Sequence, residues 1–249
     1  MIYFLIPIYN ESSNLQQLAE SLMQAAPGTD KFYVFSDDGS SDGSQKMIAE
    51  IFAGQKHIVL GDGSNHGPGY AFNTGFEWIL QHAADESDLI VTLEADNTSD
   101  AAILPDMLVI SGLGYDLVLA SVYAQGGGFE KTSFFRKLLS NTANLFFRFF
   151  FNVKVQTLSS FYRVYRLSLL KKIKASYPVL IEESGFLCML EILLKAIHCH
   201  ARILEVPMML RSSKRKGKSK MKIMRTSFSY MRFLLQTYFG KRHKPKKDS

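Results

Sequence analysis

The chain opens with the stretch Met1-Ile2-Tyr3-Phe4-Leu5-Ile6-Pro7-Ile8-Tyr9-Asn10-Glu11, in which an apolar run is followed by a polar turn and an acid. The pattern recurs twice: Phe32 to Phe35 leads into Asp37-Asp38-Gly39-Ser40, and Leu89 to Leu93 leads into Glu94-Ala95-Asp96. Short apolar runs predict buried strands. Carboxylates just past the ends of parallel strands lie where open α/β sheets bind ligands. The sequence therefore predicts an α/β fold with an acidic ligand site at one sheet edge.

Helical periodicity fills the intervals between these strands. Leucines at 15, 18 and 22 predict the first helix, and a second runs from Gln45 to about Phe52. A further strand, His57 to Leu60, and a glycine-rich loop, Gly61 to Gly69, precede a third helix that bears Phe72, Phe76, Ile79 and Leu80. Strands that alternate with helices predict a mostly parallel, Rossmann-like sheet flanked by helices.

Charge is distributed unevenly along the 249 residues. Residues 211–249 hold 14 Lys and Arg against one acid, Asp248, a net charge of +13, whereas residues 1–210 hold 15 basic and 22 acidic residues, a net charge of −7. Such asymmetry predicts a tail that meets an anionic partner: a membrane surface, nucleic acid or phosphate groups. Nucleic acid is not expected, because the chain shows no recognised nucleic-acid-binding module or stacking platform.

Hydrophobic residues make up 47% of the chain, enough for one substantial core. Cys188 and Cys199 show no metal-ligand spacing and predict buried thiols in a reducing compartment. The first residues lack the features of a signal peptide, and no run approaches the roughly 18 apolar residues of a membrane span. We therefore expect a cytoplasmic protein.

The acidic clusters favour a nucleotide and a metal ion. A dinucleotide-binding dehydrogenase would carry a glycine trio after the first strand, where this chain has Pro7, Tyr9 and Glu11. Glu11 with Asp37 or Asp38 suits base N–H groups and ribose hydroxyls. A diphosphate beside carboxylates requires a countercharge, and Glu94 with Asp96 offers hard oxygen ligands for Mg²⁺ or Mn²⁺.

Taken together, the motifs resemble the family 2 glycosyltransferases of GT-A fold, and within them the dolichol-phosphate mannose synthases and polyprenyl-phosphate sugar synthases. The likeness runs from Ile6 to about Arg225. It rests on ordered motifs, namely Pro7 to Glu11, Asp37 to Ser44, Asn65 to Gly75, Phe161 to Arg166, Gly185-Phe186 with Glu191, Glu205 to Pro207, and Gly217 to Met221. The resemblance implies a GT-A domain over residues 1–222.

The resemblance also implies roles for individual residues. Pro7, Tyr9, Glu11 and Asp37 or Asp38 would hold the base and ribose of a nucleotide-sugar donor, a GDP- or UDP-sugar. Glu94 and Asp96 would bind the metal ion, with Asp96 essential for catalysis. Arg215, Ser219 and Lys220 would reach the donor diphosphate, where they stabilise the charge that builds up as the sugar leaves.

The acceptor is expected to be a lipid phosphate. Arg136 and Ser140 lie four residues apart on an expected helix and could clasp a phosphate, and their positions resemble the acceptor-phosphate site of the lipid-phosphate branch. A phosphate is already a nucleophile, so inverting attack would need no general base. If the acceptor is instead a hydroxyl of a lipid-linked or cell-envelope glycan, a base is required, and Glu183 or Glu191 would serve.

Four positions depart from the pattern of the relatives. Glu94 replaces the usual Asp, Thr98 replaces a Gln that helps to ligate the metal, Val122 replaces an acceptor-binding Arg, and Gln156 replaces a common Asp. Val122 weakens the lipid-phosphate hypothesis. Together these changes leave open a non-catalytic nucleotide-sugar-binding protein, which turnover that depends on Asp96 would exclude.

Two stretches favour the inner membrane surface as the place of action. Residues 144–151 are dense in Phe but contain Arg148, which predicts an interfacial helix. Residues 223–249 combine an apolar helical stripe, from Met224 to Tyr238, with a basic tail. We expect this second unit to hold the enzyme peripherally on the membrane, with a membrane protein as a further candidate partner.

Overall fold

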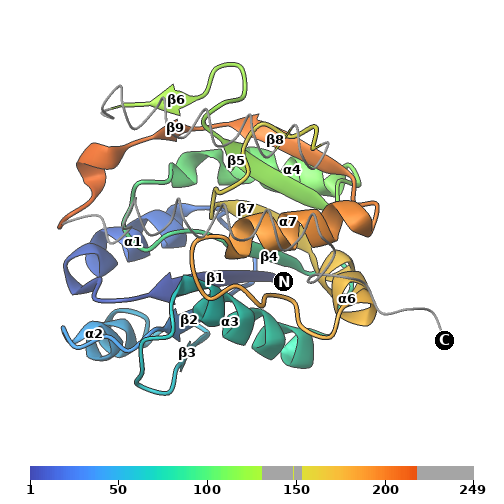
Figure 1. Ribbon diagram of the computed structural model, residues 1–249. Coiled ribbons are helices and arrows are strands. Elements are labelled where there is room, and N and C mark those ends of the chain that lie inside the picture. The colour runs from blue at the N-terminus through green and yellow to red at the C-terminus, as the bar shows by residue number, and fades with distance from the viewer. Residues whose placement is uncertain (131–147, 149–152, 218–249) are drawn as a thin grey trace.

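The computed structural model describes residues 1–130, 148 and 153–217. Within these residues seven strands form one sheet in the order β3-β2-β1-β4-β7-β5-β8 (Figure 1). The strands are β1 (Ile2–Ile8), β2 (Lys31–Asp37), β3 (His57–Leu60), β4 (Leu89–Thr92), β5 (Leu117–Ser121), β7 (Arg163–Arg166) and β8 (Ile203–Pro207). Only β7 runs antiparallel to its neighbours in this sheet. The predicted mostly parallel sheet is confirmed, and the predicted C-terminal extension, residues 223–249, lies outside the described residues.

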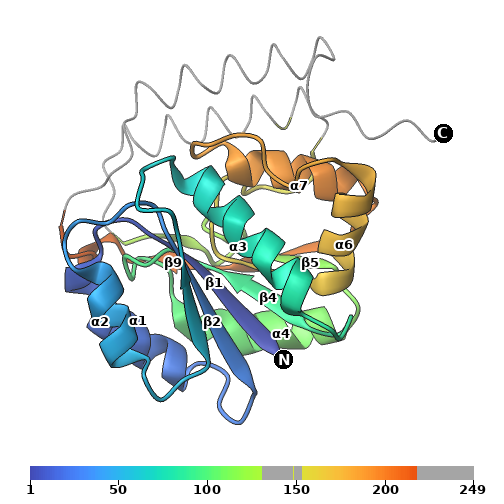
Figure 2. The same cartoon turned by 90° about the horizontal axis from the view of Figure 1, so that it is seen from below.

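Helices cover both faces of the sheet, as Figure 2 shows. One face carries α1 (Ser12–Gln24), α2 (Ser44–Ile51) and α4 (Leu104–Gly112), and the other carries α3 (Pro68–His82), α6 (Leu167–Ser176) and α7 (Cys188–His198). The short elements are η1 (Ala101–Ile103), η2 (Ser212–Lys214) and a parallel pair formed by β6 (Gly128–Phe129) and β9 (Met209–Leu210). No helix of the described residues has the length and apolar character needed to cross a membrane.

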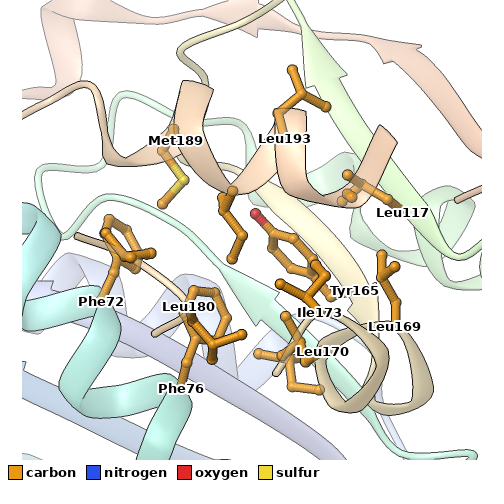
Figure 3. Close-up of a cluster of buried hydrophobic side chains, with 14 of the residues drawn as sticks. Phe72, Phe76, Leu117, Tyr165, Leu169, Leu170, Ile173, Leu180, Met189 and Leu193 are labelled. Atoms are coloured by element: carbon orange, nitrogen blue, oxygen red, sulfur yellow. The ribbon is translucent and has the colours of Figure 1, made fainter. Parts of the chain in front are cut away.

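The first strand shows why the apolar runs form central strands. Its side chains alternate between the two cores: Tyr3 and Leu5 face the side of α3, whereas Phe4 and Ile6 face the side of α1. Because helices bury both faces of the sheet, nearly every residue of this strand is apolar. On the α3 side, Phe72 and Phe76 pack with Tyr165 and Ile173 (Figure 3).

Chain order places a switch point beside β1. From β1 the chain moves outward through β2 to β3, and it then returns through α3 to β4 on the other side of β1. Strand order therefore reverses between β1 and β4, and ligands of open α/β sheets bind beyond the carboxyl ends of the strands at such a point. The predicted acidic clusters follow β1, β2 and β4.

Candidate active site

The carboxyl edge of the sheet brings the three acidic clusters together. Ile8, at the end of β1, is in register with Asp37 of β2, and the backbone N–H of Asp38 donates to the Ile8 carbonyl over 2.8 Å. Glu11 follows β1 as the residue before α1, and β4 pairs with β1 on its other side. Pro7 is half-buried within β1, and Tyr9 is exposed just beyond it.

Adjacent aspartates at the end of β2 have different partners. Asp37 is buried, and its Oδ2 accepts from the Ser40 backbone N–H (3.1 Å) and from Gln45 Nε2 (2.7 Å). Its Oδ1 is buried and has no hydrogen-bond partner among the residues that the structure describes. This oxygen is the acceptor at the edge that suits a ligand N–H.

Asp38 organises the loop before α3. Its carboxylate accepts from the backbone N–H groups of His66 (2.7 Å) and Gly67 (2.9 Å) and from Asn65 Nδ2 (3.0 Å). Burial raises the pKa of this carboxyl, while the hydrogen bonds from His66 and Gly67 oppose that rise. Asp38 therefore shapes the wall of the site, and Asp37 keeps an oxygen for a ligand.

Asn14 connects the first acidic cluster to the C-terminal part of the described chain. Its Nδ2 donates to Glu11 Oε2 (2.6 Å) and to the Lys216 carbonyl (3.1 Å), and its Oδ1 accepts from the Lys216 N–H (3.0 Å). Asn97 Nδ2 donates to the Asn14 carbonyl over 3.0 Å. Asn14 is absent from the predicted site residues, although its spacing of three residues from Glu11 on a predicted helix is a usable signal.

Glu94 and Asp96 lie just beyond β4, and each is held by a neighbouring hydroxyl. Ser99 Oγ donates to Glu94 Oε2 (2.6 Å), and Thr98 donates to Asp96 Oδ1 through both its N–H (3.0 Å) and its hydroxyl (2.7 Å). Burial, and then the charge of Asp96, raise the pKa of Glu94, whereas the Ser99 hydrogen bond lowers it. Thr98 thus orients the second acid.

A guanidinium occupies the outer oxygen of Asp96. Arg215 Nε donates to Asp96 Oδ2 over 2.7 Å, and a second nitrogen of the same side chain forms an ion pair with that oxygen. The position already accommodates a cation, which is what a metal site requires. No group of three or more His, Cys, Asp and Glu gathers within the described residues. Two carboxylates are nevertheless a donor set that Mg²⁺ or Mn²⁺ accepts when phosphate and water supply the remaining oxygens.

The segment that carries Arg215 is tied across the same edge. The Arg211 N–H donates to the Thr98 carbonyl (2.9 Å), and the Arg211 guanidinium forms an ion pair with Asp100 (2.7 Å). Together with the Lys216 contacts to Asn14, these bonds hold residues 211–217 over the acids that follow β1 and β4. Four other site residues predicted from the sequence lie outside the described residues, namely Arg136, Ser140, Ser219 and Lys220.

Glu191 lies in α7, and its carboxylate has no exposed surface. It accepts from the backbone N–H groups of Glu182 (3.0 Å) and Glu183 (2.8 Å) and forms an ion pair with Lys195 (2.6 Å). A general base must reach the proton that it removes. The contacts of Glu191 do not suit that role, because they bind the side chain within the protein.

Two further positions differ from the expected family pattern: Val122 lies directly after β5, and Gln156 lies before β7. Val122 is half-buried directly after β5. Glu205 of β8 accepts from the N–H groups of Gln156 and Thr157, each over 2.7 Å. Thr157 also contacts Ser121 through their hydroxyls (2.5 Å). Gln156 thus takes part in this arrangement through its backbone N–H.

The mostly parallel sheet, with helices on both faces and a switch point between β1 and β4, has the arrangement of the GT-A fold. The chain belongs to glycosyl transferase family 2, which it matches over residues 3–174. It is therefore a glycosyltransferase.

Relatives and solved structures agree with this assignment. The chain is 30% identical over 205 residues to polyprenol monophosphomannose synthase of Mycolicibacterium smegmatis, covering 82% of this chain and 74% of that protein. It is 28% identical to undecaprenyl-phosphate mannosyltransferase of Micrococcus luteus, covering 82% and 80%. Glucosyl-3-phosphoglycerate synthase from Mycobacterium tuberculosis, in complex with Mn²⁺, uridine diphosphate and glucosyl-3-phosphoglycerate, superposes with a TM-score of 0.64 at 13% identity, covering 98% of this chain and 81% of that one.

Proposed function

We propose that this enzyme moves a sugar, with inversion, from a nucleoside-diphosphate donor to a polyprenyl or other lipid phosphate at the membrane surface. The observation that carries the proposal is the acid pair Glu94 and Asp96 at the switch point, with the cationic Arg215 on Asp96. Names of the relatives support the acceptor class, since polyprenol and undecaprenyl phosphates are lipid phosphates. Four of the matched structures, all of the Mycobacterium tuberculosis synthase, contain Mn²⁺, which supports a divalent cation.

We place the donor along the carboxyl edge of the sheet, with its base near the ends of β1 and β2 and its diphosphate near the end of β4. The exposed ring of Tyr9 offers a face for the base, and Asp37 Oδ1 offers an acceptor for a base N–H. Glu11 and Pro7 line the same strand end and complete the proposed nucleoside site. The diphosphate then lies toward Glu94 and Asp96, with Ser219 and Lys220 as further proposed contacts.

Transfer breaks the bond between the anomeric carbon and the diphosphate oxygen and forms a bond to an acceptor oxygen. The departing diphosphate gains negative charge, so a cation that pairs with it stabilises the transition state more than the ground state. A divalent cation held by Glu94 and Asp96 would neutralise part of this charge. Arg215 supplies a guanidinium at the same place, with two N–H groups that suit phosphate oxygens.

The acceptor phosphate would bind to Arg136 and Ser140 and attack directly. An ionised phosphate needs no proton removed, which agrees with the burial of Glu191. Val122, in place of the arginine of relatives, favours one alternative: a glycan hydroxyl as acceptor. In that case Glu183, on the segment before α7, would be the base.

We further propose that the enzyme acts peripherally on the cytoplasmic face. The net charge of +13 over residues 211–249 supports attraction to anionic lipids. The tail would bring the acceptor lipid to the site, with a membrane protein as an additional anchor.

Calorimetric titration tests the donor site first. The full chain is titrated with UDP, GDP and their common sugar conjugates, each with Mn²⁺, Mg²⁺ or chelator. We expect one nucleotide to bind in a cation-dependent manner. A folded sample that binds none of them would contradict the proposal.

Substitution at the acid pair then tests turnover. We expect Asp96→Asn to abolish sugar transfer to a polyprenyl phosphate while the protein stays folded, because the change removes one carboxylate charge from the cation site. Asp106→Asn, at the exposed start of α4, is the matched control and should retain full activity. Transfer that survives in Asp96→Asn would place the cation elsewhere.

A further inference from the structure

Residues 179–184 form an irregular segment between α6 and α7. Leu180 and Ile181 are buried in the core on the α3 side, and Leu180 points into the cluster that Figure 3 shows. Buried backbone without helix or strand needs other partners for its N–H and C=O groups, since each unpaired group carries a large desolvation penalty. The source of those partners shows what fixes the segment.

One set of partners comes from an ion pair on α7. Lys195 and Glu191 are both buried, with 1% and 0% of their side chains exposed. Lys195 Nζ donates to the carbonyls of Val179 (2.9 Å) and Leu180 (3.1 Å) and to Glu191 Oε1 (2.6 Å), so all three of its protons have acceptors. The Glu191 carboxylate accepts the N–H groups of Glu182 and Glu183.

An apolar pair could not provide these bonds. Burying two charges costs more than their attraction returns unless further hydrogen bonds satisfy them, and a well-packed apolar pair is often at least as stable. Here Lys195 and Glu191 each form hydrogen bonds with two backbone groups of the same irregular segment. The pair therefore determines the conformation of the segment in addition to contributing to the core.

A second set of partners comes from α3. Asn73 Oδ1 accepts from the Ile181 N–H (3.1 Å), and the Ser184 carbonyl accepts from the Gly69 N–H (2.8 Å). Gly67, which directly precedes α3, donates its N–H to Asp38 over 2.9 Å. A continuous series of hydrogen bonds therefore connects α7, through residues 179–184, to the loop before α3 that Asp38 binds.

We propose that Lys195 and Glu191 are positioning residues for sugar transfer. The pair fixes residues 182–184 against the start of α3. It thereby sets the position of the Glu182 and Glu183 carboxylates relative to the loop of residues 61–67 that precedes α3. This inference rests on the proposed function for its chemistry, but the contacts on which it stands are independent of the identity of donor and acceptor. Lys195 lies outside the sequence motifs, and its role follows from its contacts.

Hydrogen exchange with mass spectrometry reads the positioning directly. In Lys195→Met we expect faster exchange in the peptides that contain residues 179–184 and 67–73, with exchange in β1 and β2 unchanged. Ile48→Ala, which opens a cavity in the core on the α1 side, is the control for global destabilisation and should accelerate exchange throughout. An even acceleration in Lys195→Met would overturn the proposal.

Steady-state kinetics provide a second test of the proposal. Per folded molecule, we expect Lys195→Met to lower kcat by roughly tenfold to a hundredfold, the range that small displacements of reacting groups produce. Donor affinity measured by calorimetry should stay within about twofold, because the proposed nucleoside contacts lie at the ends of β1 and β2. Lys195→Arg retains charge and donors and should recover part of kcat. Unchanged kcat per folded molecule would overturn the proposal.

A third variant covers the case in which Lys195→Met does not fold, since it leaves the Glu191 charge buried alone. Asn73→Ala loosens the segment from the α3 side without leaving a buried charge, and we expect the same localised exchange and the same fall in kcat. Exchange and kcat unchanged in Asn73→Ala would overturn the inference. A wild-type protein that binds no nucleotide would instead overturn the proposed function, because the exchange pattern does not depend on donor binding.

Discussion

At the scale of single residues, neighbouring positions of like chemistry differ in role because a strand alternates its faces. Asp37 points toward α2, where Gln45 binds it, and Asp38 points toward the loop before α3. The sequence predicts an acidic pair there but cannot separate the two, because the partners of each come from distant elements. For the same reason it does not predict the contact between Asp96 and Arg215, which are 119 positions apart.

That contact leads to a prediction on metal affinity. Replacing Arg215 by Gln removes a cation that competes for Asp96, so we expect Mn²⁺ alone to bind about tenfold more tightly, in line with the net value of a hydrogen bond to a charged group. The donor, by contrast, should bind more weakly in the presence of Mn²⁺, because its diphosphate loses the guanidinium. Calorimetry with and without nucleotide measures both.

Arg202→Gln provides the control for this prediction. Arg202 pairs with Asp116 before β5 and β8, at the opposite edge of the sheet. Its replacement should change neither affinity. If Arg215→Gln leaves the affinity for Mn²⁺ alone unchanged, the guanidinium does not compete with the ion.

At the scale of elements, local pattern predicts the first half of the sheet well. All four predicted strands, Met1 to Ile6, Phe32 to Phe35, His57 to Leu60 and Leu89 to Leu93, are confirmed within two residues at each end, with β1 continuing through Pro7 to Ile8. The order of the strands and the reversal of β7 could not be predicted. They depend on crossovers and contacts between distant segments, which apolar periodicity does not encode.

The start of α3 yields a prediction for one glycine. A Cβ on Gly69 would lie 1.8 Å from the Glu183 carbonyl oxygen and 2.9 Å from its carbon, and both are backbone atoms. We expect Gly69→Ala to push residues 182–184 away from α3, to lower the melting temperature by several degrees and to reduce transfer activity more than tenfold. Thermal unfolding and sugar-transfer assays measure the two effects.

Gly54→Ala is the matched substitution. A Cβ on Gly54 would have no atom of another residue within 4 Å apart from its chain neighbours, so the change should leave both stability and transfer close to wild type. Equal behaviour of the two variants would show that the close approach of α3 and Glu183 does not matter for the reaction.

At the scale of the whole molecule, charge separates the chain into an acidic body and a basic tail. We expect the full chain to bind vesicles that contain phosphatidylglycerol and to dissociate as salt rises, since exposed charges are screened over about 10 Å at 0.1 M salt. Changing the five basic residues between 241 and 247 to Gln should weaken binding at least tenfold, because each basic residue near the surface contributes about 1 kcal/mol. Vesicle sedimentation at several salt concentrations measures this.

The control changes Lys46 and Lys56 to Gln, since both are exposed on the body of the protein. These changes should leave vesicle binding nearly unaltered. Binding that persists at high salt in the tail variant would mean that apolar insertion, and not charge, holds the protein on the membrane.

The reversed strand β7 has a consequence for how such enzymes diversify. The last residue of β4 is in register with the first residue of β7, Arg163, and β5 ends at Ser121 on the same edge. The chain therefore leaves the sheet at the end of β5 and rejoins it at the start of β7 on the same side. An insertion or deletion between β6 and β7 changes the length of this connection without moving β5 or β7 along their partners. Under the proposed function, a lineage could therefore change its acceptor through this one piece of chain, while the residues after β1, β2 and β4 that are proposed to hold the donor stay the same.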